Sequence, residues 1–251
     1  MNREEIILSH ITKSGLGLEI GPSYSPVAPK RDGWNVVSID HLDAGSLRAK
    51  YLAWGVDVTK IEEVDYLASG DGIFSPIGEE EKFDYIIASH VIEHMPDIVS
   101  FLADCEKLLK LNGVLSLAIP DKNRCFDYLK PLSTAGQIIQ AFFEKRNRHL
   151  PGVIFDAHAL HVKHKKSGEI LWFTDVTEDE LSYVHTKLEA KKIMDDYVNS
   201  GKYMDVHAWQ FTPKSFLEIL DDLIAIGLTR MRLVSSTETI GHEFFISLRK
   251  T

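Results

Sequence analysis

Short apolar runs alternate with amphipathic stretches through the first 120 residues. This alternation is typical of βαβ units around a parallel sheet, so we expect the apolar runs to form its strands. Two further strand-like runs near the end are joined by a short connection, which predicts an antiparallel pair at the sheet edge. The expected strands are residues 17–20, 35–39, 64–67, 85–88, 114–119, 231–234 and 243–248.

Two stretches carry the pattern of a core-facing helix. In 98–109, apolar residues recur at spacings of three and four, Asp97 is a suitable N-cap, and Asn112-Gly113 supplies a left-handed stop. In 213–226, Thr212 precedes a proline at the first helical position. The residues expected to face inward are Ile98, Phe101, Leu102, Cys105, Leu108 and Leu109 in the first helix, and Phe216, Leu217, Leu220, Leu223 and Ile224 in the second.

The alternation stops between residues 130 and 206, where helices are expected near 135–145 and 178–199. We interpret this segment as a helical insertion over the carboxyl edge of the sheet, where it would bind the substrate. Residues 1–129 and 207–251 would form the core. The predicted fold is therefore an α/β, doubly wound, mainly parallel sheet with an insertion.

Composition excludes several classes of protein. Of the 251 residues, 44% are hydrophobic and 26% charged, which is typical of a folded globular protein. The net charge of −9 argues against a nucleic-acid partner. Cys105 and Cys125 lack the spacing of a disulfide framework or a zinc ribbon. With no signal peptide and no apolar run of the roughly 18 residues that span a membrane, we expect a cytoplasmic protein.

The loop after the first strand indicates the kind of ligand. The glycines at 15, 17 and 21 do not have the GxGxxG spacing that brings a pyrophosphate onto a helix N-terminus, and no Walker loop occurs. An adenosine compound without phosphates is the better candidate. Asp40, nineteen residues after Gly21, could accept hydrogen bonds from both hydroxyls of a ribose. The alternative is that Asp40 merely caps the next helix.

At this point the chain resembles class I S-adenosylmethionine-dependent methyltransferases. The matching motifs are Leu-Glu-Ile-Gly (18–21), Asp40, Phe-Asp-Tyr-Ile-Ile-Ala-Ser-His-Val-Ile-Glu-His (83–94), Leu-Asn-Gly-Val-Leu (111–115) and Phe-Thr-Pro (211–213). Two more segments, 117–122 and 205–213, look like methyltransferases associated with bacterial surface-polysaccharide synthesis.

The resemblance implies a seven-stranded Rossmann-like sheet with S-adenosylmethionine at its carboxyl edge. The glycine loop would lie beside the methionine part, Asp40 on the ribose, Asp71-Gly72 near the adenine, and Ser89-His90 along the cofactor. The chain departs from the family's fuller glycine pattern at Pro22-Ser23-Tyr24. The expected cofactor-binding residues are Glu19, Gly21, Pro22, Asp40, His41, Asp71, Gly72, Ser89 and His90.

A competing interpretation is a zinc hydrolase, because His90-Val-Ile-Glu-His94 has the HxxEH spacing. Pro96 would interrupt the required helix, and no third ligand is evident in the sequence. His158, His161 and His164 are spaced by three, but they have no cysteine and few acids near them. We expect no metal ion at either place.

The insertion carries the candidate acceptor site. Residues 145–166 contain six bases and one acid, which could attract an anionic acceptor, although a solvated charged surface is the simpler interpretation. Methyl transfer depends mainly on alignment, and a hydroxyl acceptor also needs a base. His207 is the first candidate base, followed by Asp156 and His158; His207 could equally pack the insertion onto the core.

We therefore expect an O-methyltransferase that acts on a small molecule or carbohydrate, such as a sugar or glycan precursor. The alternatives are an N-methyltransferase for another metabolite and an inactive scaffold subunit that binds the cofactor. The sequence leaves the acceptor, its atom and a homo-oligomer open.

Overall fold

The computed structural model describes residues 2–68, 70–170, 172 and 176–251. Seven strands form one sheet: β1 (Gly17–Ile20), β2 (Val36–Asp40), β3 (Tyr66–Leu67), β4 (Phe83–Ser89), β5 (Leu109–Pro120), β8 (Arg232–Ser236) and β9 (Glu243–Arg249). Their order is β3-β2-β1-β4-β5-β9-β8. The first five strands are parallel, and β9 is antiparallel to both β5 and β8. The predicted α/β sheet and its antiparallel edge are confirmed.

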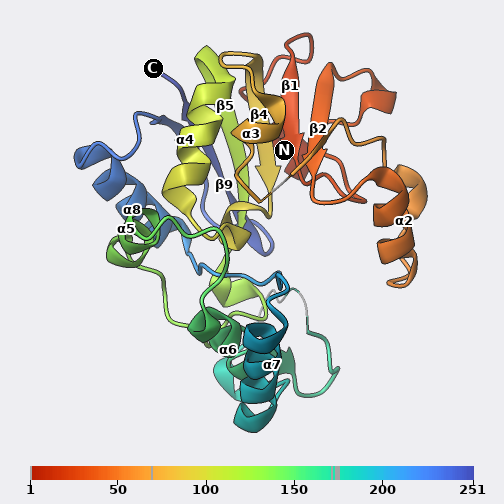
Figure 1. Cartoon of the computed structure of the whole chain (residues 1–251), viewed down its shortest axis with the longest axis vertical. Coiled ribbons are helices and arrows are strands. Elements are labelled where there is room, and N and C mark those ends of the chain that lie inside the picture. The colour runs from red at the N-terminus through yellow and green to blue at the C-terminus, as the bar shows by residue number, and fades with distance from the viewer. Residues whose placement is uncertain (1, 69, 171, 173–175) are drawn as a thin grey trace.

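Helices cover the sheet as the periodicity predicts. On one side lie α3 (Phe74–Ile77), α4 (Ile98–Leu108) and α8 (Pro213–Ala225), with α5 (Ala135–Phe143) in contact with α4 and α8 (Figure 1). All six residues expected to face inward from the first helix are buried. In α8, Phe216, Leu220 and Leu223 are buried, while Leu217 and Ile224 pack at the margin of the core.

The remaining helical elements are shorter or lie at the ends of the sheet. Helix α1 (Arg3–Ile7) packs near β5 and β9, and α2 (Ala44–Leu52) follows β2. Four 3₁₀ turns connect the core elements: η1 (Lys30–Asp32), η2 (Val58–Lys60), η3 (Ile92–His94) and η4 (Lys122–Arg124). Only η1 lies between β1 and β2, where a doubly wound fold usually places a full helix.

The insertion differs from the prediction in its second half. The expected helix over 178–199 is confirmed only from residue 187, because η5 (Glu178–Glu180) and β7 (Leu181–Tyr183) precede α7 (Lys187–Ser200), which Thr186 caps. Strand β7 pairs with β6 (Val162–His164), and the sequence pattern also missed α6 (Pro151–Ala159). Helices α6 and α7 pack together beyond the end of the sheet to which β4 points (Figure 1).

Two local predictions are corrected. Asn112, with a φ of 66°, does not end α4; that helix stops at Leu108, and Asn112 lies where β5 shifts register against β4. Asp40 does not cap α2, because the side chain of Asp43 accepts the hydrogen bond from Ser46 N. Cys105 and Cys125 are both buried free thiols. Within the described residues, no helix is both long and apolar enough to cross a membrane.

Candidate active site

The first part of the site is the loop that leaves β1. Gly21 has a φ of 62°, and an added Cβ would lie 3.5 Å from Val91 Cγ2, so the loop turns sharply against the segment that follows β4. Glu19 is 3% exposed and accepts hydrogen bonds from Val27 N at 2.6 Å and Ala28 N at 3.1 Å. Glu19 therefore stabilises the loop by binding its backbone from the buried side. This structural role differs from the cofactor contact expected from the sequence.

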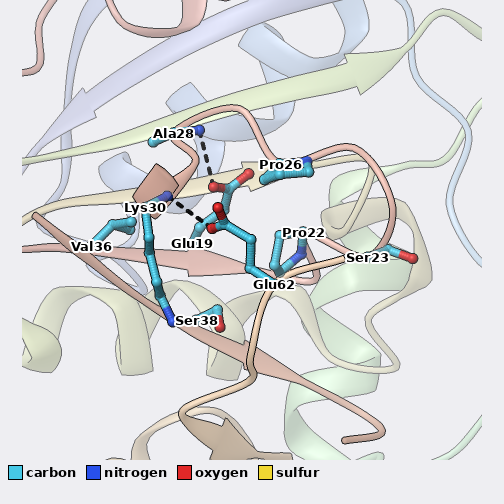
Figure 2. Close-up of a pocket in the computed structure, with 9 residues that line it drawn as sticks. All are labelled: Glu19, Pro22, Ser23, Pro26, Ala28, Lys30, Val36, Ser38 and Glu62. Atoms are coloured by element: carbon cyan, nitrogen blue, oxygen red, sulfur yellow. Dashed lines mark hydrogen bonds between the residues drawn. The ribbon is translucent and has the colours of Figure 1, made fainter. Parts of the chain in front are cut away.

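Figure 2 shows this loop folded over Glu19 above β1 and β2. Glu62 supports it from the other side by accepting from Lys30 N at 2.8 Å. Pro22 and Ser23 line the small pocket beneath the loop together with Glu19 and Glu62. Burial raises the pKa of Glu19 to about 7, although the two backbone N–H groups that it binds act in the opposite direction.

Asp40 lies at the carboxyl end of β2, beside this loop, and is 4% exposed. Its Oδ1 accepts from His41 N at 2.7 Å and lies 2.6 Å from His41 Nδ1. Its Oδ2 accepts one long bond of 3.3 Å from Ser23 N. A carboxylate oxygen accepts two hydrogen bonds, so Oδ2 retains capacity for a ligand hydroxyl. The residues present therefore fit a ribose at this position.

The other predicted cofactor residues lie in different surroundings. Asp71 and Gly72 are exposed after β3, where Asp104 of α4 fixes the turn by accepting from Ile73 N and Phe74 N. Ser89 Oγ accepts from Arg3 Nη2 at 2.6 Å. His90 has a φ of 53°, and its Nε2 lies 2.8 Å from Glu243 Oε2. Arg3 and Glu243 could not be identified from the sequence, because no local pattern links residues 240 positions apart.

The second part of the site is a set of acids, histidines and one lysine, which we call the acid–histidine cluster. It joins η3 to the segment after η4 and to the segment before α8. Its members are Glu93, His94, Asp127, Lys130, Asp205 and His207.

His207, the predicted base, occupies the centre of this cluster and is 7% exposed. Its Nδ1 lies 2.6 Å from Asp127 Oδ2, and its Nε2 lies 3.9 Å from Glu93 Oε1. Lys130 Nζ lies 2.6 Å from the other oxygen of Asp127. Although burial opposes it, the charge of Lys130 and the hydrogen bond from His207 hold the pKa of Asp127 well below its usual range.

The backbone brings these side chains together. Ala208 N and Trp209 N both donate to the carbonyl of Glu93, at 2.8 and 3.2 Å. Trp209 Nε1 donates to Met95 O at 2.5 Å. The segment before α8 is therefore hydrogen-bonded along η3, and His207 is positioned against the turn that follows β4.

Asp156 and His158 do not join this cluster in the structure. Asp156 is exposed on α6, and the half-buried ring of His158 lies near His161 and His185 instead. His164, which shares their spacing in the sequence, lies apart from this group, with its Nδ1 3.1 Å from Ser167 Oγ.

The basic stretch at 145–166 is partly used inside the insertion. Arg146 pairs with Glu144 at 2.6 Å, Arg148 Nε donates to Tyr197 Oη at 2.9 Å, and Lys165 donates to the carbonyl of Asp179. These three basic side chains bind partners within the protein. They are therefore less suited to attract an anionic acceptor.

Comparisons with known proteins agree with this geometry. Residues 16–115 match the family model described as a methyltransferase domain. Two curated relatives are named ubiquinone biosynthesis O-methyltransferase. The one from Pasteurella multocida (strain Pm70) is 40% identical over 60 residues, covering 24% of this chain and 25% of the relative. The one from Histophilus somni (strain 2336) is 31% identical over 107 residues, covering 41% and 43%.

The matches thus span less than half the length of these curated relatives. Among solved structures, the PH0226 protein from Pyrococcus horikoshii OT3 is similar with a TM-score of 0.50 and 12% identity, over 99% of this chain and 87% of that one. At this identity the similarity shows the fold. The narrower expectation, an enzyme of surface-polysaccharide synthesis, has no support in these comparisons. The names of the relatives refer to ubiquinone biosynthesis instead.

Proposed function

We propose that this chain is an S-adenosylmethionine-dependent O-methyltransferase of a small molecule. The observation that carries the proposal is Asp40, a buried carboxylate at the carboxyl end of β2 with one oxygen available beside the left-handed turn at Gly21. In a doubly wound sheet, ligands bind outside the carboxyl ends of the strands, and this edge belongs to the methyltransferase domain.

When bound, S-adenosylmethionine supplies a sulfonium methyl group; the methyl passes to an oxygen, the electrons of the carbon–sulfur bond stay on sulfur, and the hydroxyl proton leaves. The chain's own contribution is to align the reactants and to weaken the acceptor O–H bond. Asp40 and the loop from Gly21 to Ser23 would bind the cofactor. The acid–histidine cluster, with His207 at its centre, would receive the acceptor hydroxyl. Asp156 and His158 are proposed only as groups that contact the acceptor from α6.

Two acceptor classes are favoured by separate observations. A sugar or glycan precursor is expected from the sequence resemblance in 117–122 and 205–213. A phenol is suggested by the relatives named ubiquinone biosynthesis O-methyltransferase. Both present the hydroxyl that the cluster would activate.

The test combines binding and turnover. Calorimetry with S-adenosylhomocysteine should show binding to the full chain, weakened about 10- to 100-fold by Asp40→Ala, since a hydrogen bond to a charged group contributes roughly 1.5–3 kcal/mol. Asp221→Ala, which removes an exposed acid from α8, is the matched control. Equal binding by wild type and Asp40→Ala would argue against the proposal.

Turnover is measured with a radiolabelled methyl donor and a panel of sugars, phenols and amines. Label transferred to a sugar or a phenol supports O-methylation, and label transferred only to amines identifies the N-methyltransferase alternative. Cofactor binding without transfer to any acceptor or cell extract would indicate an inactive scaffold.

A further inference from the structure

The acid–histidine cluster contains a buried charge that its protein neighbours do not satisfy. Glu93 is 0% exposed, and both of its carboxylate oxygens are buried without a hydrogen-bond partner. The nearest charged or titratable atoms are His94 Nε2 at 3.8 Å and His207 Nε2 at 3.9 Å from Oε1. These separations are too long for hydrogen bonds. An unpaired carboxylate in the interior is costly, so a cation bound beside it would be stabilising.

The two histidines are oriented as metal-binding histidines are. His94 Nδ1 lies 2.9 Å from Asp205 Oδ1, and His207 Nδ1 lies 2.6 Å from Asp127 Oδ2. An aspartate on each Nδ1 fixes the tautomer with its proton there, so that each Nε2, 3.8 or 3.9 Å from Glu93 Oε1, keeps a lone pair for a ligand. A carboxylate behind a histidine is the usual outer support of a histidine ligand.

The distances and the charge both suit one divalent ion. Zinc lies about 2.0–2.2 Å from nitrogen and oxygen ligands, so two of its ligands can be no more than about 4.2 Å apart. The two separations to Glu93 fall inside this limit, and all three ligand atoms lie within 4.8 Å of one another, which a small side-chain rotation closes. Glu93, Asp127 and Asp205 outnumber Lys130 by two charges, which a divalent cation would balance.

We propose that Glu93, His94 and His207 bind a divalent transition-metal ion of the zinc class. Two imidazoles and one carboxylate favour such an ion over magnesium or calcium, which prefer oxygen ligands. Three protein ligands leave a coordination position open, as in catalytic zinc sites. No pattern in the sequence indicates this site, because the third ligand, His207, lies 113 residues after His94.

The site lies next to the proposed cofactor position. Val91 packs against Gly21, and Glu93 and His94 follow Val91 by two and three residues. Resting on the proposed function, we infer that the ion receives the acceptor hydroxyl at its open position. A metal-bound hydroxyl has a lowered pKa, so its proton leaves to solvent water and the oxygen becomes the nucleophile. His207 then acts as a ligand of the ion.

The site is tested on the full chain freed of metal with a chelator. Calorimetry with ZnCl₂ should show one ion per chain, and Co²⁺ should give the visible absorption of a low-coordinate site. Glu93→Gln and His207→Gln should each weaken binding of Zn²⁺ by more than 100-fold. Asp127→Asn should weaken it about 10- to 100-fold, the usual effect of losing an outer carboxylate.

Two control variants make the assignment specific. His10→Gln removes an exposed histidine near the N-terminus and should leave binding unchanged. His161→Gln alters the separate group of His158, His161 and His185 and should also leave it unchanged. Loss of the ion in His161→Gln but not in Glu93→Gln would overturn the proposal, as would the absence of any Zn²⁺ binding below about 100 µM.

Binding of S-adenosylhomocysteine, measured on the same samples, separates this inference from the proposed function. If the chain binds the cofactor product and transfers methyl groups but binds no Zn²⁺, the metal site is wrong and the methyltransferase assignment stands. If the chain binds Zn²⁺ through Glu93 but not S-adenosylhomocysteine, the metal site stands and the assigned function fails.

Discussion

Asp127 and Lys130 form an ion pair in which both side chains are almost fully buried, at 2% and 3% exposure. Removing one charge should therefore cost far more than removing both. We expect Asp127→Asn to lower the free energy of unfolding by about 3–5 kcal/mol, because the Lys130 ammonium is left buried without a counter-ion. Adding Lys130→Met should recover most of this loss. Urea unfolding of the two single variants and the double variant measures the coupling.

The asparagine retains an oxygen for His207 Nδ1, so the effect reports on charge more than on the hydrogen bond. A double variant whose loss equals the sum of the single losses would show that the pair does not couple. The exposed i,i+4 pair Lys191–Asp195, treated in the same way, should change stability by less than 1 kcal/mol.

Glu19 predicts a pH dependence of stability. Its pKa is about 7 in the folded chain against 4.5 ordinarily, because of burial. Between these values the folded state binds more protons than the unfolded state, so the contribution of Glu19 to stability is full below pH 4.5 and falls as the pH rises toward 7. The stability of the wild type relative to Glu19→Gln should thus fall by as much as roughly 3 kcal/mol over this window, at about 1.4 kcal/mol per pKa unit. Urea unfolding from pH 4.5 to 8 measures it. An exposed control, Glu4→Gln, should show no such trend, and a pH-independent difference for Glu19→Gln would contradict the raised pKa.

Candidate functional residues could be identified from the sequence more readily than the groups that they contact in the folded chain. Asp40 and His207 could be singled out because each follows a recognisable strand or precedes a recognisable helix. The roles of Glu19 and Glu93 could not be predicted, since each depends on backbone or ring atoms that only the folded chain brings near. An acid in an apolar stretch, such as Glu93 after β4, was the one available signal.

Strand β1 passes so close to β4 that its first residue has no room for a side chain. A Cβ on Gly17 would lie 2.0 Å from two ring atoms of Tyr85, which is itself 1% exposed. We expect Gly17→Ala to destabilise the chain by at least about 1–3 kcal/mol through overpacking. Thermal unfolding of Gly17→Ala, alone and with Tyr85→Leu, provides the measurement.

The smaller side chain in the double variant should relieve the clash and recover part of the loss. The control is Gly152→Ala in the first turn of α6, where an added Cβ meets nothing within 4 Å. That variant should be neutral or slightly stabilising, because alanine favours a helix over glycine by about 1 kcal/mol. Equal losses at both glycines would mean that the approach of β1 to Tyr85 is not tight.

The elements were predictable where one hydrophobic pattern decides them. All seven strands and the helices α4 and α8 follow from apolar runs and periodicity. The prediction failed in 178–186, where a helix was expected although β7 comes first. Three-residue strands such as β6 and β7 are too short to show a hydrophobic periodicity. Their pairing is supported by tertiary contacts, since Tyr128 and Leu129 pack against Val162 and Leu181.

On the scale of the whole molecule, the proposed cofactor and acceptor sites share the edge of one sheet, with the insertion beyond it. The seven-stranded sheet could be expected from the family resemblance. The contact between η3 and the segment before α8 could not be expected from it. Hydrogen bonds from Ala208 and Trp209 to Glu93 fix that contact, and they link residues more than 110 positions apart. Long-range backbone contacts of this kind leave no periodic trace in a sequence.

Because the cofactor site is built from loops that the sheet positions, binding there should stabilise the whole chain. A ligand at 100 times its Kd adds about 2.7 kcal/mol to the free energy of unfolding when it binds only the folded state. For a domain of this size, each kcal/mol raises Tm by about 2–4 °C, so saturating S-adenosylhomocysteine should raise Tm by roughly 5–11 °C. Differential scanning calorimetry over a range of ligand concentrations gives the measurement. With binding weakened about 10- to 100-fold, Asp40→Ala should show a shift reduced to about half or less at the same concentrations, and Asp221→Ala should match the wild type. A shift of full size in Asp40→Ala would place the ligand away from the carboxyl end of β2.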